Sequence, residues 1–325
     1  MATYKEIKGT SIEVVSSDPS NPQLGQIWYN TTSQTLKGLE FGAAAWSAGG
    51  NLGTARYYPG SAGTQTAGLA FGGSPGSSPF MTNSTEEYNG SSWTAGGNLG
   101  TTRTALQGCG LQTAGLGFGG YVQGGGNQIV TEEYDGSSWT SGGNLTSARE
   151  KLSGAGTQTA GLAVGGEPSP VSNATEEYDG SSWTNGGNLN TGRRASAGAG
   201  TQTAGLIFGG TPTPSRDLTE EYDGSSWTNG GTLNTGTTEL GGSGIQTAAL
   251  AFGGDPPGGV TGATEEYDGS SWTTSSAILS TARKRLAGTG TTSASLAFGG
   301  DTPPTTTATE EFTSAGPTTV TISSS

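Results

Sequence analysis

Thr131-Glu-Glu-Tyr-Asp-Gly-Ser-Ser-Trp139 is the stretch that decides the fold, because it recurs along the chain. Further copies lie at 85–93, 175–183, 219–227 and 264–272, and a decayed copy without tryptophan lies at 309–316. A strand rich in Thr, Ala, Gly and Leu precedes each copy and ends in a glycine pair. The pairs begin at Gly72, Gly119, Gly165, Gly209, Gly253 and Gly299, at spacings of 47, 46, 44, 44 and 46 residues. This period predicts six repeated units, each too short to bury a core alone.

The unit from Trp139 to Ser182 shows how each repeat is built. It predicts four short strands and no helix, so the fold class is all-β. The dipeptide Asp179-Gly180 favours a type I′ hairpin turn, in which both residues have positive φ.

The strand before each glycine pair predicts how the units pack. In Thr66–Gly72, alternation places Leu69 and Phe71 on one face and small residues on the other. The large face of one sheet can therefore lie against the nearly bare face of the next. Each equivalent side chain would contribute roughly 1.5–3 kcal/mol when buried. These side chains are Leu116, Leu162, Leu206, Leu250 and Leu296, with Phe118, Val164, Phe208, Phe252 and Phe298.

A glycine pair, then Glu-x-Tyr-Asp and a tryptophan, resembles the kelch repeat of β-propellers. The resemblance covers all six units and implies a six-bladed kelch-like propeller within residues 39–325, with a short N-terminal β-hairpin extension before it. The last unit lacks its outer strand. We expect Trp46–Leu52 to supply it, with Thr318–Ser323 as the rival. The structural tryptophans would be Trp93, Trp139, Trp183, Trp227 and Trp272.

Paired glutamates accompany every unit, as in Glu132-Glu133. Neighbouring residues of a strand point to opposite faces, so one pair cannot act as acid and base on one bond. We expect one Glu to bond an arginine such as Arg103 or Arg149, and its mate to be solvated. The equivalent arginines are Arg56, Arg193 and Arg283, whereas the fifth unit has Thr237 and its Glu needs another partner.

Composition excludes several classes of function. The 325 residues carry a net charge of −13, which disfavours a nucleic-acid partner. There is no histidine and a single cysteine, Cys109, so we expect no cofactor and no catalytic or metal site, including the copper site found in one kelch-type oxidase. No long apolar run predicts membrane insertion, and Met1–Thr10 lacks the apolar region of a signal peptide. The Asp-Gly-Ser-Ser-Trp turn also departs from the Asp box of sialidases, because its Asp stands directly before the Gly.

Sequence variation between units is concentrated in the loops after the glycine pairs and in the residues after the arginines. Equivalent loops lie on one rim of a propeller, and rim loops on a rigid scaffold often bind ligands. The alternative is neutral drift of unconstrained loops. The candidate binding residues are Tyr57, Tyr58, Phe80, Tyr121 and Arg216.

Residues 1–38 lie outside the repeats. Gly25-Gln-Ile-Trp-Tyr-Asn-Thr-Thr32, followed by Leu36-Lys37 and Trp46, resembles a short module of bacteriophage tail-fibre and other virion proteins. The strands on either side of Asn30–Gln34 predict a hairpin. The resemblance implies attachment to other virion proteins and an oligomeric assembly. The alternative is that the hairpin only caps the next domain.

Together these features predict a non-enzymatic structural or adhesive virion protein, on a tail fibre or the capsid surface. It would be assembled in the host cytoplasm and would bind a host surface glycan or protein through the rim loops. The alternatives are a cellular kelch-type adaptor and, less favoured, a glycan-acting enzyme.

Overall fold

The computed structural model describes residues 12–167, 171–212 and 216–322, which form two compact units. The larger unit spans residues 45–313, and the described residues of the smaller one are 12–44 and 314–322. This division differs from the expected domains, 1–38 and 39–325. The reason is that the C-terminal strand pairs with the N-terminal segment.

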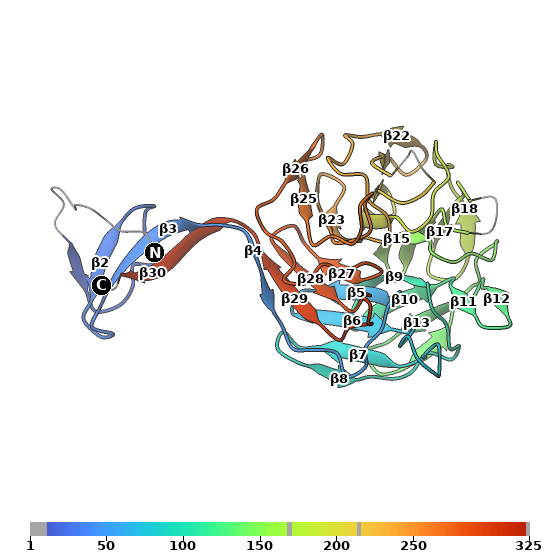
Figure 1. Cartoon of the computed structure of the whole chain (residues 1–325), viewed down its shortest axis with the longest axis horizontal. Helices are drawn as coiled ribbons and strands as arrows, with labels where there is room; N and C mark the ends of the chain where they lie inside the picture. Colours follow the sequence, from blue (N-terminus) through green and yellow to red (C-terminus); the bar gives the residue numbers. More distant parts are fainter. Residues whose placement is uncertain (1–11, 168–170, 213–215, 323–325) are drawn as a thin grey trace. The chain divides into compact units, whose positions relative to one another are not determined.

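Six four-stranded antiparallel sheets form the described part of the larger unit, with one small two-stranded hairpin. They surround a common centre in a propeller-like arrangement, and the first strand of each is innermost (Figure 1). From the centre outward, the first three sheets are β5 (Gly60–Thr64), β6 (Ala67–Phe71), β7 (Thr85–Tyr88) and β8 (Trp93–Ala95); β9 (Gln107–Leu111), β10 (Ala114–Phe118), β13 (Thr131–Tyr134) and β14 (Trp139–Ser141); and β15 (Ser153–Thr157), β16 (Ala160–Val164), β17 (Thr175–Tyr178) and β18 (Trp183–Asn185).

The next two sheets repeat this order. They are β19 (Ala197–Thr201), β20 (Ala204–Phe208), β21 (Thr219–Tyr222) and β22 (Trp227–Asn229); and β23 (Gly241–Ile245), β24 (Ala248–Phe252), β25 (Thr264–Tyr267) and β26 (Trp272–Thr274). The small hairpin is β11 (Tyr121–Val122) and β12 (Gly126–Asn127).

The sixth sheet takes its outer strand from the other end of the sequence. It contains β27 (Ala287–Gly290), β28 (Ala294–Phe298) and β29 (Thr309–Thr313), and β4 (Ala45–Ala48) pairs with β29 so that Trp46 lies opposite Phe312. β27 in turn contacts β5, which makes the sixth and first sheets neighbours. The rival segment is not used here, because residues 316–322 belong to the smaller unit.

The sheets pack as the alternation predicts. The predicted leucine and phenylalanine positions, with Val164, are at most 1% exposed. A Cβ added to Gly161 would lie 2.7 Å from Cδ2 of Leu116 in the preceding sheet, so glycine leaves room for that leucine. The same relation joins Gly205 to Leu162. The core is therefore a succession of layers between sheets.

Polar side chains also join neighbouring sheets. The indole of Trp183 donates to Oγ1 of Thr131 (2.9 Å), and the amide of Gln158 donates to the carbonyls of Gly115 (3.1 Å) and Tyr134 (2.8 Å). Between the sixth and first sheets, Gln65 donates to the carbonyls of Ser295 and Phe312. The expected structural tryptophans and Trp46 all donate to a threonine of the preceding sheet.

The first glutamate of each pair meets an arginine where one is present. Nη2 of Arg149 lies 2.6 Å from Oε1 of Glu176, and Nη1 donates to two main-chain carbonyls. Arg149 is fully buried. The equivalent ion pairs are Arg56–Glu86, Arg103–Glu132, Arg193–Glu220 and Arg283–Glu310.

The second glutamate corrects an expectation, because it is not simply solvated. Oε1 of Glu133 accepts a 2.5 Å hydrogen bond from the hydroxyl of Tyr178 in the next sheet. Burial and this bond raise the pKa of Tyr178 to about 12. Equivalent bonds are Tyr88–Glu311, Tyr134–Glu87, Tyr222–Glu177 and Tyr267–Glu221. Five of the six Glu-Glu pairs therefore bond within their own sheet and to the next one. Glu266 is the exception, because the next sheet has Phe312 at the tyrosine position.

The expected type I′ turn is wrong. Tyr134 pairs with Trp139, so the loop has four residues, and only its glycine, Gly136, has positive φ. Oδ1 of Asp135 instead accepts from the amides of Ser137 and Ser138, both at 2.8 Å. These bonds hold the pKa of Asp135 near 2. The aspartate acts as an acceptor for the turn's main chain.

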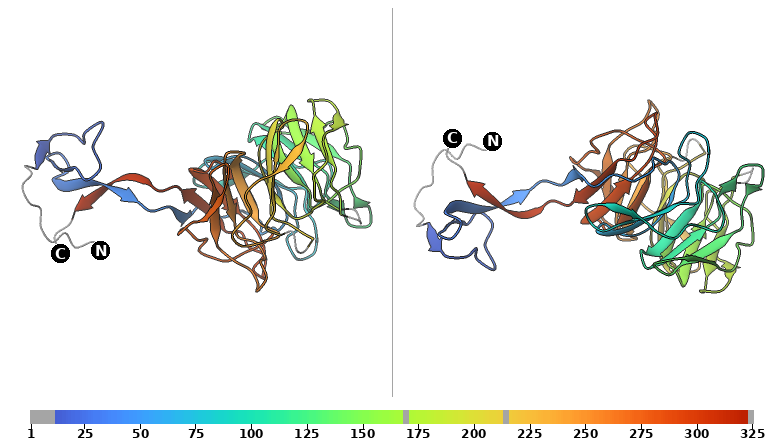
Figure 2. Two further views of the ribbon diagram at one scale, coloured as in Figure 1. Left: turned by 90° about the horizontal axis from the view of Figure 1, so that it is seen from above. Right: turned by 90° about the horizontal axis from the view of Figure 1, so that it is seen from below.

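The smaller unit contains β1 (Glu13–Val15), β2 (Ile27–Asn30), β3 (Thr35–Gly42) and β30 (Gly316–Ile322) in that order. The predicted hairpin is confirmed as β2 and β3, and β30 runs antiparallel beside β3 (Figure 2). The carboxylate of Asp18 accepts from the side chains of Trp28 (3.0 Å), Asn30 (2.7 Å) and Lys37 (2.7 Å). Lys37, Asn30 and Trp28 lower the pKa of Asp18 to about 2. The buried Trp28 is thus covered within this unit.

Candidate functional site

Six equivalent residues form a circle of main-chain hydrogen bonds at one end of the inner strands. The amide of Tyr58 donates to the carbonyl of Arg285 (2.8 Å), and the amide of Arg285 donates to the carbonyl of Glu239 (2.7 Å). The series continues through the remaining members and returns to its start. Its members are Tyr58, Ala105, Lys151, Ala195, Glu239 and Arg285.

All six circle residues have φ between 50° and 58°, although none is glycine. This left-handed conformation is uncommon for residues with side chains, and such strain is concentrated at functional sites. Here the same backbone conformation carries different side chains. The circle therefore keeps one backbone geometry at six positions while the side chain differs from unit to unit.

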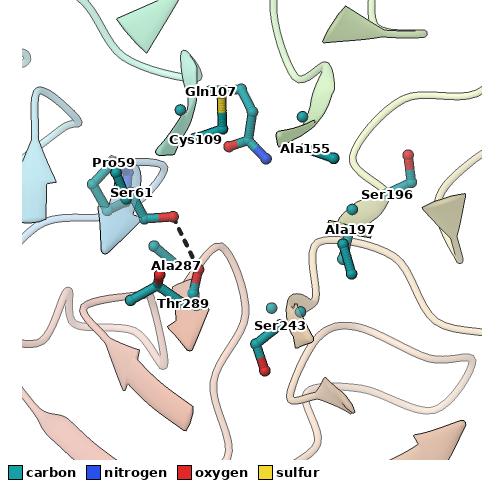
Figure 3. A pocket seen from close by; sticks show the side chains of 18 of the residues that line it. Pro59, Ser61, Gln107, Cys109, Ala155, Ser196, Ala197, Ser243, Ala287 and Thr289 are labelled. Carbon is teal, nitrogen blue, oxygen red and sulfur yellow. Dashed lines mark hydrogen bonds between the residues drawn. The ribbon is translucent and has the colours of Figure 1, made fainter. Parts of the chain in front are cut away.

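The circle residues line a cavity of about 200 Å³ at the centre of the sheets. Its wall below them consists of the inner strands, whose lining side chains are mostly short. Figure 3 shows Ser61, Ala155, Ala197 and Ala287 around the open centre. Among the lining residues the charged groups lie only at the circle, so that end has the chemistry to discriminate between ligands.

Glu239 is the centre of a polar cluster at this end. Its Oε1 accepts from the hydroxyl of Tyr58, and its Oε2 lies 3.0 Å from Nε of Arg285. The guanidinium of Arg285 also lies 5.4 Å from the ring centre of Tyr58 and 5.7 Å from that of Tyr57. Burial, and then the charge of Glu239, raise the pKa of Tyr58 far above its ordinary value. Tyr58 is therefore a neutral hydrogen-bond donor.

A second layer of charges surrounds this cluster. Lys284 binds Asp255 (2.7 Å) and lies 3.7 Å from Glu239, and Arg285 lies 3.3 Å from Asp301. These residues lie just before the inner strands of the fifth and sixth sheets or in the loops after the second strands of those sheets. We call Tyr57, Tyr58, Glu239, Lys284, Arg285, Asp255 and Asp301 the mouth cluster.

The two variable regions of the repeat meet at this end. Glu150 pairs with Glu167 through an isolated β-bridge, as Lys284 does with Asp301 and Tyr57 with Ser74. Strand direction places the glycine pairs, and the loops after them, beside the circle. The opposite end carries the Asp-Gly-Ser-Ser turns, which hardly vary.

The candidate binding residues all belong to this rim, but only two are brought together. The rings of Tyr57 and Tyr58 are 5.9 Å apart in the mouth cluster. Phe80 is 57% exposed on the first loop, and Tyr121 is half-buried in β11. Arg216 reaches the carbonyl of Asp255 in the next loop at 3.4 Å.

Sequence reasoning missed Glu239 and Arg285 as site residues. Both occupy the repeat position of Tyr58, two residues after the arginine. Alignment of the units on that arginine could have found Arg285. Glu239 was obscured because its unit has Thr237 there instead.

Clusters of metal-binding side chains and membrane-spanning helices are absent from the described residues. Among residues 12–167, 171–212 and 216–322, no group of three or more metal-binding side chains is present. The same residues contain no helix long and apolar enough to cross a membrane. Cys109 lines the central cavity but is 7% exposed, and burial raises its thiol pKa to about 12.

Comparison of the sequence with protein-family models gave no match, and comparison with curated proteins gave none either.

Proposed function

We propose that this chain is a non-enzymatic structural or adhesive protein of a bacteriophage virion. Its larger unit would be a closed six-bladed kelch-like propeller that binds a host surface glycan or protein. Its smaller unit would attach it to other virion proteins within an oligomeric assembly.

The observation that carries the binding role is the circle of six equivalent residues. One backbone conformation presents Tyr58, Glu239 and Arg285 on one side of the circle, and two alanines with Lys151 on the other. An aromatic face beside paired charges suits recognition of a polar surface ligand. A repeat selected only for stability has no need of such asymmetry.

The distribution of the buried carboxylates supports a role without catalysis. The first glutamates bond arginines or main-chain amides, and five of the second glutamates bond tyrosines, so these groups stabilise the sheets. The closed ring is supported by the bonds of Gln65 and of Trp93 to the sixth sheet.

The virion assignment rests on the sequence motif Gly25–Thr32. Residues of this motif stabilise the smaller unit. Trp28 and Asn30 share the carboxylate of Asp18 and so stabilise a compact β-sheet module. Such a module is suited to join a propeller to a larger particle.

Immuno-electron microscopy tests this proposal. Antibodies raised against residues 45–313 should label the surface of purified phage particles whose genome encodes the chain. Labelling only of host-cell lysate, with unlabelled particles, would favour the cellular adaptor instead. Release of sugar from purified host polysaccharide by the protein would contradict the non-enzymatic role.

A further inference from the structure

The fifth sheet lacks the buried arginine that the other five contain. Thr237 stands at the position of Arg56, Arg103, Arg149, Arg193 and Arg283. In the third sheet, the guanidinium of Arg149 contacts Glu176 and the carbonyls of Gly165 (2.9 Å) and Ala174 (3.0 Å). The corresponding groups of the fifth sheet are Glu265 and the carbonyls of Gly253 and Ala263.

Glu265 remains buried, at 6% exposure, without that cation. It accepts hydrogen bonds from the main chain and side chain of Asn234 (2.8 and 3.1 Å) and from the amide of Thr235 (3.0 Å), all uncharged donors. Within the described parts of the chain it forms no ion pair. The carbonyl of Arg216 accepts from the amide of Thr237 (3.0 Å), but its guanidinium is directed to Asp255.

A cavity of about 20 Å³ lies where the guanidinium would be. Thr237, Glu265, Gly253 and Ala263 are among the residues that line it. A space of at least about 10–15 Å³ is needed for one water molecule. The cavity is thus large enough for a single water-sized particle.

We propose that this cavity binds a monovalent cation of the size of sodium, potassium or ammonium. An uncompensated buried carboxylate is strongly unfavourable, and one positive charge replaces that of the missing arginine. Carboxylate, carbonyl and hydroxyl oxygens are the ligands that hard cations prefer. Divalent ions are less suited, because they are usually bound through more than one acidic group or with retained water.

Thermal unfolding of the full chain in different chloride salts tests the site. At equal ionic strength, at least one of the three small cations should raise Tm by about 2–4 °C over choline, which is too large to enter. The increase should saturate with concentration. T237R should raise Tm in choline and abolish the difference between the salts.

Two amide substitutions separate this site from general salt effects. E265Q removes the negative charge of the side chain and leaves its shape nearly unchanged. It should abolish the dependence of Tm on the cation. E176Q, in the third sheet where Arg149 fills the site, should leave the dependence intact. Equal Tm values in choline and in all three small cations would overturn the proposal, as would an E265Q variant that keeps the difference. If T237R does not fold, the Tm difference between choline and the small cations in E265Q tests the proposal.

Discussion

The hydroxyl of Tyr178 donates a 2.5 Å hydrogen bond to Oε1 of Glu133, and the two residues belong to neighbouring sheets. The bond turns a motif repeated along the chain into a repeated connection between units. Because the hydroxyl also accepts from the amide of Gly143 (3.3 Å), it joins three segments.

Removal of this hydroxyl should weaken the junction between the second and third sheets. Y178F should lower the free energy of unfolding by about 1–3 kcal/mol, since a partly buried carboxylate loses its donor. Denaturant unfolding measures the change. Y29F, on the exposed side of the smaller unit, serves as the control and should have an effect of less than about 0.5 kcal/mol. Equal effects of the two substitutions would show that the bond contributes nothing.

The same bonds predict a dependence on alkaline pH. Tyr88, Tyr134, Tyr178, Tyr222 and Tyr267 have pKa values raised to about 12, chiefly by burial and by the neighbouring glutamate. The folded state holds these protons more tightly than the unfolded state, whose tyrosine pKa is about 10. Their stabilising contribution is complete below pH 10 and is lost as pH rises through 12. Tyrosinate absorbance should show these groups titrating well above the exposed tyrosines, and a single transition near pH 10 in the folded protein would contradict this.

The buried arginine–glutamate pairs should contribute more to the free energy of unfolding than partly exposed ion pairs do. A buried group that loses its hydrogen-bond partner generally costs about 1–3 kcal/mol. Because Arg149 and Glu176 are almost completely buried, the expected loss is about 3–5 kcal/mol. The double variant R149M/E176Q should recover part of it, since no charge then remains unpaired. A loss below about 1 kcal/mol for R149A, measured by denaturant unfolding, would contradict the structural role of the pair.

The outer strand of the sixth sheet gives a deletion test. Trp46 packs against Phe252 and Phe312, with ring centres 4.9 and 5.2 Å away, and donates to Thr264 (2.9 Å). A chain of residues 45–313 should therefore fold with the secondary structure of the larger unit. A chain of residues 49–313 should unfold at a lower temperature in calorimetry. Equal stability of the two would show that β4 is dispensable.

Much of this fold can be predicted from the sequence, because the strands and their buried faces recur in every repeat unit. The alternation of Leu69 and Phe71 with small residues predicts both the strand and the face it buries. The arginine–glutamate pairs follow from two positions that recur in five of the six units.

The features that the sequence leaves open depend on contacts between units or between chain ends. The Tyr178–Glu133 bond requires the register of one sheet against the next, which strand alternation does not determine. The pairing of β3 with β30 joins segments nearly as far apart as the chain allows. Glu239 is remote in sequence from Tyr58, and only the circular order of the sheets brings them together.

The thiol of Cys109 reports on access to the central cavity. Because burial raises its pKa to about 12, the reactive thiolate is scarce at neutral pH. Iodoacetamide should modify the protein only when denaturant unfolds it, as mass spectrometry can measure. Complete modification of the folded protein would show that the cavity admits small reagents to its inner strands.

Cell binding by rim variants tests the central claim, that the variable rim binds the host surface. Phe80 and Leu111 are exposed to similar extents, 57% and 55%, at opposite ends of the larger unit. Fluorescently labelled wild-type protein, F80A, R285A and L111A would be titrated onto bacteria of the host strain. We predict at least tenfold weaker binding for R285A, weaker binding for F80A and unchanged binding for L111A, with equal Tm values for F80A and L111A. Wild-type affinity in both rim variants, or a loss confined to L111A, would contradict the claim.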